Sequence, residues 1–110
     1  MNDERRVSSP DGRKNPRLQI AQEFILSHRT IGKSTCLSRD LSLSGVFLQG
    51  RFPDIRPGDT VGLKFSMGPG AATYELDASV ARVADDGIGL KFLSLDMDTY
   101  GALLDLTMLA

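Results

Sequence analysis

The sequence has few of the residues from which metal centres, disulfides and many active sites are built. Its 110 residues include one histidine, His28, and one cysteine, Cys36. A lone cysteine cannot form an intramolecular disulfide, and these two residues fall short of the four ligands of a structural zinc site. We therefore expect no metal and no cofactor, and we interpret His28 as a loop residue and Cys36 as a half-buried one.

Long apolar runs and a strong excess of one charge are also missing. No stretch approaches the ~20 apolar residues that span a bilayer, and the polar N-terminus has no signal-peptide core, so we expect a cytoplasmic protein without membrane insertion. The formal net charge is −1, so no DNA binding is expected. Residues 1–17 nevertheless hold five basic against three acidic residues, whereas the remainder holds eight against eleven.

Residues 1–17 and residues 18–110 differ in composition and pattern. The first part is rich in Asn, Asp, Ser, Gly, Pro and Arg without periodicity, which predicts a flexible N-terminal arm. From residue 18 onward, apolar residues alternate with polar ones in short segments separated by turn signals such as Pro57-Gly58 and Asp86-Gly87. This pattern predicts an all-β domain, a small barrel or sandwich, whose strands lie near residues 18–27, 33–43, 46–48, 60–67, 73–84 and 88–92.

The last segment changes to helical spacing. Met97, Tyr100, Leu104 and Met108 lie three or four residues apart, which predicts a C-terminal helix with Ser94 or Asp96 as its N-cap. We interpret this stripe as core packing or as a dimer surface, so the protein is expected to be a monomer or a homodimer.

Two motifs with enzymatic associations have simpler interpretations. Gly32-Lys33-Ser34-Thr35 resembles the end of a phosphate-binding loop, but the glycine required five positions earlier is Ser27, and a strand is predicted to follow instead of a helix. A hydrolase that uses Asp40 with His28 has no third orienting group. The chain is therefore not expected to be an enzyme.

The segment Asp40-Leu41-Ser42-Leu43-Ser44-Gly45 combines a carboxylate, a hydroxyl and a glycine. In a strand, Asp40 and Ser42 would project side by side, with Leu41 and Leu43 turned to the opposite face. Gly45 has no Cβ and lets a ligand come close. Extended over the whole strand, the alternation puts Cys36, Ser38, Asp40 and Ser42 on one face and Leu37, Leu41 and Leu43 on the other.

The arm carries a second group of polar residues, Arg13, Lys14 and Arg17. Arginine binds phosphate through a planar fork, stacks on bases and pairs with the O6/N7 edge of guanine. A carboxylate supplies the acceptor for the N1–H and N2–H groups of guanine. The arginines together with Asp40 therefore suit a guanine nucleotide.

The two groups together resemble the PilZ domain signature. Arg13 and Arg17 form Arg-x-x-x-Arg, and Asp40, Ser42 and Gly45 form Asp-x-Ser-x-x-Gly after a gap of one strand and part of the next. The likeness covers roughly residues 10–110 and continues in three further stretches, Gly45-Val46-Phe47-Leu48, Pro57-Gly58-Asp59 and Gly87-Ile88-Gly89-Leu90-Lys91-Phe92.

The resemblance implies a six-stranded antiparallel β-barrel with a C-terminal helix, and a receptor for the bacterial second messenger cyclic di-GMP. Arg13 and Arg17 would grip phosphates and guanine, Asp40 and Ser42 would bond guanine, and Gly45 would keep the surface low. Many members have two adjacent arginines where this chain has Arg13-Lys14; Lys14 keeps the charge at the ligand but lacks the planar fork.

The resemblance also implies a mode of action. The arm would fold over one or two ligand molecules and so create or hide a surface for a downstream protein of the motility, pilus, secretion or transcription machinery, with biofilm formation among the processes controlled. The alternative is a PilZ-like adaptor that no longer binds the nucleotide and works through protein contacts alone.

Overall fold

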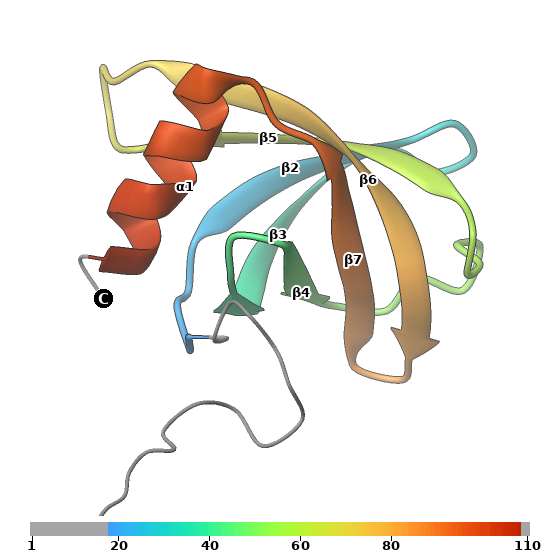
Figure 1. Ribbon diagram of the computed structural model, residues 1–110. Coiled ribbons are helices and arrows are strands. Elements are labelled where there is room, and N and C mark those ends of the chain that lie inside the picture. Colours follow the sequence, from blue (N-terminus) through green and yellow to red (C-terminus); the bar gives the residue numbers. More distant parts are fainter. Residues whose placement is uncertain (1–17, 109–110) are drawn as a thin grey trace, which may run out of the picture.

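The computed structural model describes residues 18–108, which form a closed six-stranded antiparallel β-barrel followed by one helix (Figure 1). The predicted fold class is therefore confirmed. The predicted arm, with Arg13, Lys14 and Arg17, lies outside the described residues. The elements are β2 (Glu23–His28), β3 (Gly32–Leu41), β4 (Gly45–Gln49), β5 (Thr60–Ser66), β6 (Thr73–Ala84), β7 (Gly87–Ser94) and α1 (Met97–Met108).

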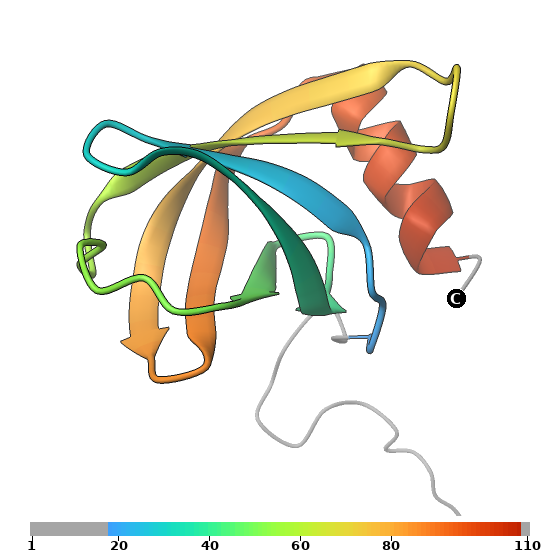
Figure 2. The same cartoon turned by 180° about the vertical axis from the view of Figure 1, so that it is seen from behind.

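The strands close in the order β2-β3-β4-β7-β6-β5, with β5 pairing back to β2 (Figure 2). Closure gives each of these strands two neighbours and so leaves no free sheet edge among them. Tight turns join most neighbours, whereas residues 50–59 carry the chain from β4 to β5. Pro57-Gly58 makes the predicted turn there: Gly58 has a φ of 94°, and Asp59 N donates to Arg56 O at 3.1 Å.

Alternating apolar residues fill the barrel as predicted for most strands. Phe24 and Leu26 of β2 and Val61, Leu63 and Phe65 of β5 are buried. The rings of Phe24 and Phe65 lie 5.4 Å apart between centroids, within the range of favourable aromatic pairs. This interior fixes which face of each strand remains outside for a ligand.

The predicted faces of β3 are wrong in its first half. Cys36 and Ser38 are buried and Leu37 is 50% exposed, yet Leu41 is buried as well. The cause is a β-bulge between Ser38 and Asp40, where β3 has one residue more than β4. An extra residue reverses the alternation. Ser38 and Leu41 therefore both face the core, and Asp40 faces outward.

The helix begins as predicted but packs through a different face. Asp96 Oδ1 accepts a hydrogen bond from Thr99 N at 2.7 Å, and this backbone bond lowers the pKa of the Asp96 carboxyl. Thr99, Ala102 and Leu103 are the buried positions, whereas Met97 and Met108 are largely exposed. The interpretation of the methionine stripe as core packing is thus wrong for Met97, Tyr100 and Met108, and its alternative as a dimer surface stays a prediction.

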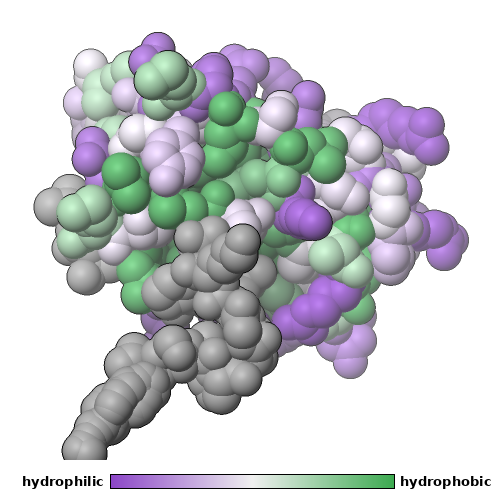
Figure 3. Space-filling view, viewed as in Figure 1, coloured by the Kyte–Doolittle hydropathy of each residue, from purple (hydrophilic) through white to green (hydrophobic). Residues whose placement is uncertain are grey.

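Apolar side chains gather on the face of the molecule that carries α1 (Figure 3). Residues 18–108 contain no helix with the length and apolar character that a membrane crossing requires.

Candidate functional site

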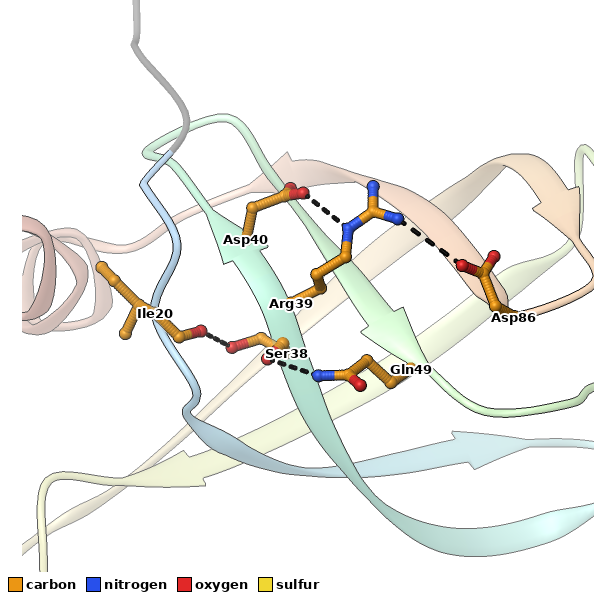
Figure 4. A network of polar contacts seen from close by, with 6 residues as sticks. All are labelled: Ile20, Ser38, Arg39, Asp40, Gln49 and Asp86. Carbon is orange, nitrogen blue, oxygen red and sulfur yellow. Dashed lines mark hydrogen bonds and ion pairs between the residues drawn. The ribbon is translucent and has the colours of Figure 1, made fainter.

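Asp40 lies on the outer face of the barrel, next to the end of β3. It pairs with Phe47 of β4, and its side chain is 15% exposed. The neighbouring Arg39 donates from Nε to Asp40 Oδ2 at 3.2 Å, and its Nη1 lies 3.7 Å from Asp86 Oδ2 (Figure 4).

Ser42 lies beyond the end of β3, in the turn to β4. Its Oγ accepts the backbone N–H groups of Ser44 and Gly45, each at 3.2 Å, and its own N donates to Gly45 O at 2.9 Å. The side chain is buried. The prediction that Asp40 and Ser42 project side by side from one strand face is therefore wrong, because β3 ends at Leu41 and Ser42 is buried. Its hydroxyl instead builds the turn that leads from Asp40 to Gly45, which begins β4.

The described chain begins directly beside this turn. Leu18 and Leu41 exchange two backbone hydrogen bonds, Leu18 N to Leu41 O at 2.9 Å and Leu41 N to Leu18 O at 2.8 Å. Leu41 lies between Asp40 and Ser42 in the sequence, and Leu18 directly follows Arg17. The structure thus brings the attachment point of the arginine segment to the Asp40–Gly45 turn.

Ser38 strengthens this attachment from inside. Its Oγ accepts from Gln22 N at 2.9 Å and donates to Ile20 O, and Ser38 N donates to Gln22 O at 2.9 Å. The Ser38–Ile20 contact is visible in Figure 4. Residues 18–22 are therefore held along β3 although β2 itself begins only at Glu23.

Phe47 and two arginines were not predicted as part of this surface. Phe47 is buried, but its strand neighbours Val46 and Leu48 belong to the core and it does not. The Cζ atoms of Arg39 and Arg82 lie 3.8 and 5.1 Å from its ring centroid. The run of three apolar residues concealed that the middle one faces outward.

Of the two glycines of β7, Gly87 makes room for the Phe47 ring and Gly89 for the stem of Arg82. A Cβ on Gly87 would lie 2.2 Å from Leu48 O and 2.4 Å from a Phe47 ring carbon, and a Cβ on Gly89 would lie 3.2 Å from Arg82 Cγ. Glycine inside a strand indicates such a close approach. The Gly87-x-Gly89 spacing was therefore the sequence feature that could have indicated large side chains lying close to β7.

His28 takes part in a separate contact. The interpretation of His28 as a loop residue is wrong, because it belongs to strand β2. It ends β2, is buried, and its Nε2 lies 2.9 Å from Asp59 Oδ2. Thr30 N donates to Nδ1 at 3.1 Å, so the ring proton is on Nε2 and is donated to Asp59. This bond, followed by one from Arg56 N, lowers the pKa of the Asp59 carboxyl. His28 thus belongs with Asp59 and gives Asp40 no catalytic partner.

The remaining candidates have structural explanations. Gly32 begins β3 after a tight turn, so the residues after it enter a strand and no helix N-terminus faces a phosphate. Cys36 is buried in the core and not half-buried as predicted, and burial raises the pKa of its thiol. No group of three or more His, Cys, Asp and Glu gathers to hold a metal ion in residues 18–108.

A surface hollow of about 650 Å³ lies elsewhere on the barrel. Strands β2, β5 and β6 and the start of β3 line it, with Lys33, Lys64, Glu75 and Asp77 among the lining residues. Charges of both signs surround it, and neither Asp40 nor Ser42 contributes, so it is distinct from the predicted site.

Comparison with known proteins identifies related domains. The PilZ domain family matches residues 11–109. No curated protein sequence matches this chain. Among solved structures, the PilZ domain of YcgR from Escherichia coli, determined with c-di-GMP, has a TM-score of 0.68 at 16% identity and covers 88% of this chain and 92% of that chain.

Two further structures share the fold. The PilZ domain of CeSA from a cellulose-synthesizing bacterium has a TM-score of 0.66 at 14% identity, covering 86% of this chain and 97% of that chain. The Bacillus subtilis inhibitor of motility, MotI/DgrA, has a TM-score of 0.73 at 15% identity. The match covers 87% of this chain and 49% of MotI/DgrA, so this chain spans about half the length of that protein.

Proposed function

Because this chain belongs to the PilZ domain family, we propose that it is a non-catalytic receptor for cyclic di-GMP. The observation that carries the proposal is the pair of hydrogen bonds between Leu18 and Leu41. They tether the residue after Arg17 beside Asp40, so the arginine segment and the outward carboxylate are within reach of one ligand.

In this proposal the site has a fixed half and a closing half. Asp40, fixed on the barrel, accepts the N1–H and N2–H groups of a guanine. Arg13, Lys14 and Arg17 close over the ligand, because guanidinium and ammonium groups bind phosphate and arginine also stacks on bases. Ser42 acts by holding the turn, and Gly45 lets the ligand approach the backbone because it has no side chain.

Closure over the ligand has an energetic cost and a regulatory consequence. Ordering residues 8–17 costs roughly 1–2 kcal/mol per fixed backbone residue, which the charged contacts must exceed. The ordered segment then creates or hides a surface for a downstream protein of the motility, pilus, secretion or transcription machinery. We further propose a cytoplasmic location and a monomer or homodimer.

Calorimetric titration with cyclic di-GMP tests the proposal. The wild type should bind, and Arg13→Ala and Arg17→Ala should each lose affinity by roughly tenfold or more, the effect of one charge-assisted contact. Absence of heat from the wild type at tens of micromolar ligand would refute the receptor. Unchanged affinity in both variants would refute the assigned residues while leaving the receptor intact.

A second candidate is an adaptor that acts only through protein contacts. The exposed side chains of Met97, Tyr100 and Met108 along α1 favour it, because they offer an apolar strip to a partner. Under this alternative, a partner would bind equally well with and without cyclic di-GMP, and Arg17→Ala would leave that binding unchanged.

A further inference from the structure

A row of four paired residues crosses the outer face of the barrel from Asp40. Asp40 pairs with Phe47, Phe47 with Gly89, and Gly89 with Arg82. Cross-strand partners share one face of a sheet. Arg82, on β6, is therefore on the same face as Asp40, although three strand pairings separate them.

Gly89 lets Arg82 reach back along this row. A Cβ at Gly89 would lie 3.2 Å from Arg82 Cγ, 3.6 Å from Nε and 3.9 Å from Cδ, so the stem of Arg82 crosses β7 over the bare backbone. Its guanidinium ends 5.1 Å from the centroid of the Phe47 ring. The stem is therefore packed against the barrel, and the charged end lies near the ring of Phe47, the cross-strand partner of Asp40.

The two guanidinium groups on Phe47 differ in their charge partners. Arg39 has Asp40 at 3.2 Å and Asp86 at 3.7 Å. Arg82 forms no ion pair with any residue in the range 18–108, and it is exposed. Of the two cations, Arg82 is the one whose charge is left for an anion.

We propose that Arg82, seated on Phe47, is a fixed phosphate-binding residue for the same ligand whose guanine contacts Asp40. The proposal rests on the receptor function above and adds a cation from the barrel itself to those of the arm. A stem that is already packed loses less rotamer freedom on binding than a free arginine, so its contact costs less entropy. Phosphate suits the planar fork bidentately.

Arg39 then has the role of positioning the Asp40 carboxylate. Its bonds to Asp40 and Asp86 hold the carboxylate beside the Phe47 ring and neutralise it before a ligand arrives. A guanine edge and an Arg82-bound phosphate would thus meet a surface whose polar groups are already oriented.

The test measures cyclic di-GMP affinity by calorimetry at several salt concentrations, for the wild type, Arg82→Gln and Arg82→Lys. Arg82→Gln keeps most of the stem over Gly89 and Phe47 but removes the charge. It should lose roughly tenfold in affinity, with a shallower salt dependence because one screened contact is gone. Arg82→Lys, which keeps the charge without the fork, should lose less affinity and keep the salt dependence.

Arg29→Gln is the matched control, because Arg29 is an exposed arginine in the turn between β2 and β3; it should bind as the wild type does. Thermal melting of each variant checks the fold. If Arg82→Gln binds with wild-type affinity, the phosphate subsite is refuted and the receptor function is not. If Arg82→Gln loses affinity but keeps the wild-type salt dependence, the subsite is also refuted, because Arg82 then only covers the Phe47 ring and does not contact phosphate. A wild type that binds no ligand would overturn the receptor and the subsite together.

Discussion

Ser42 contributes to the site through the backbone of its turn. Its buried hydroxyl accepts the N–H groups of Ser44 and Gly45. Ser42→Ala would leave both groups without this acceptor, and a buried unsatisfied group costs about 1–3 kcal/mol. We expect the free energy of unfolding in urea to fall by about that amount.

Ser44→Ala is the comparison for this prediction. Ser44 is exposed, and within residues 18–108 the one hydrogen bond of its Oγ is with Ser42 Oγ at 3.1 Å, so its loss should change stability by less than about 0.5 kcal/mol. Equal stability of Ser42→Ala and Ser44→Ala would contradict the role of the Ser42 hydroxyl in stabilising the turn.

Gly87 is the position where a single methyl group should do most damage. A Cβ there would overlap Leu48 O and the Phe47 ring. Gly87→Ala should destabilise the fold by about 1–3 kcal/mol or more, because packed strands leave little room to move. Thermal unfolding measures this directly.

Gly101 serves as the control glycine. Nothing lies within 4 Å of a Cβ built there, and the residue is inside α1. Gly101→Ala should therefore stabilise the protein by about 0.5–1 kcal/mol. A Gly87→Ala variant as stable as the wild type would mean that β4 and β7 are less closely packed than described.

At the scale of elements, β3 marks where prediction from the sequence succeeded and where it failed. Its existence and approximate ends follow from alternating apolar residues. Its bulge does not, because one extra residue leaves no distinct signature in the pattern, yet it reverses the faces of Cys36, Ser38 and Leu37. The outward face of Asp40 was predicted from an alternation that the bulge had already shifted.

The helix shows a similar limit. Its N-cap at Asp96 was predictable from local chemistry. Its packing face was not, because Thr99, Ala102 and Leu103 recur at the same spacing as the methionine stripe. Which stripe packs inward depends on the space that the barrel leaves, and that is a property of the whole fold.

The connection from β4 to β5 should respond to acid. Asp59, in this connection, bonds His28 at the end of β2, and that bond lowers the pKa of the Asp59 carboxyl from 3.8. A lowered folded-state pKa gives stability that is present above the unfolded value and is lost as the pH falls through the folded value. Stability should therefore decrease below about pH 3.8.

Asp59→Asn separates this contribution from general acid unfolding. The variant should be less stable than the wild type at neutral pH, and the difference should shrink as the pH falls below 3.8. Asp54→Asn, at an exposed position in the same connection, should follow the wild-type curve. A constant difference between Asp59→Asn and the wild type at all pH values would exclude the carboxylate as the cause.

At the scale of the whole molecule, barrel closure joins segments that the sequence separates. Leu18 and Leu41 are hydrogen-bonded although 22 residues lie between them. The two motifs were recognisable in the sequence, and so was their order. The row from Asp40 through Phe47 and Gly89 to Arg82 was not, because it depends on the register of four strands.

The most direct test of the two-part site is a titration of isotope-labelled protein with cyclic di-GMP, followed by amide NMR shifts. The account predicts that the largest changes at saturation lie at Leu18, Leu41, Ser44 and Gly45 and at the outward positions of β4, with little change at Thr30 and Asp59. No change at saturating ligand would contradict the receptor. Changes confined to the hollow between β2, β5 and β6 would contradict the site.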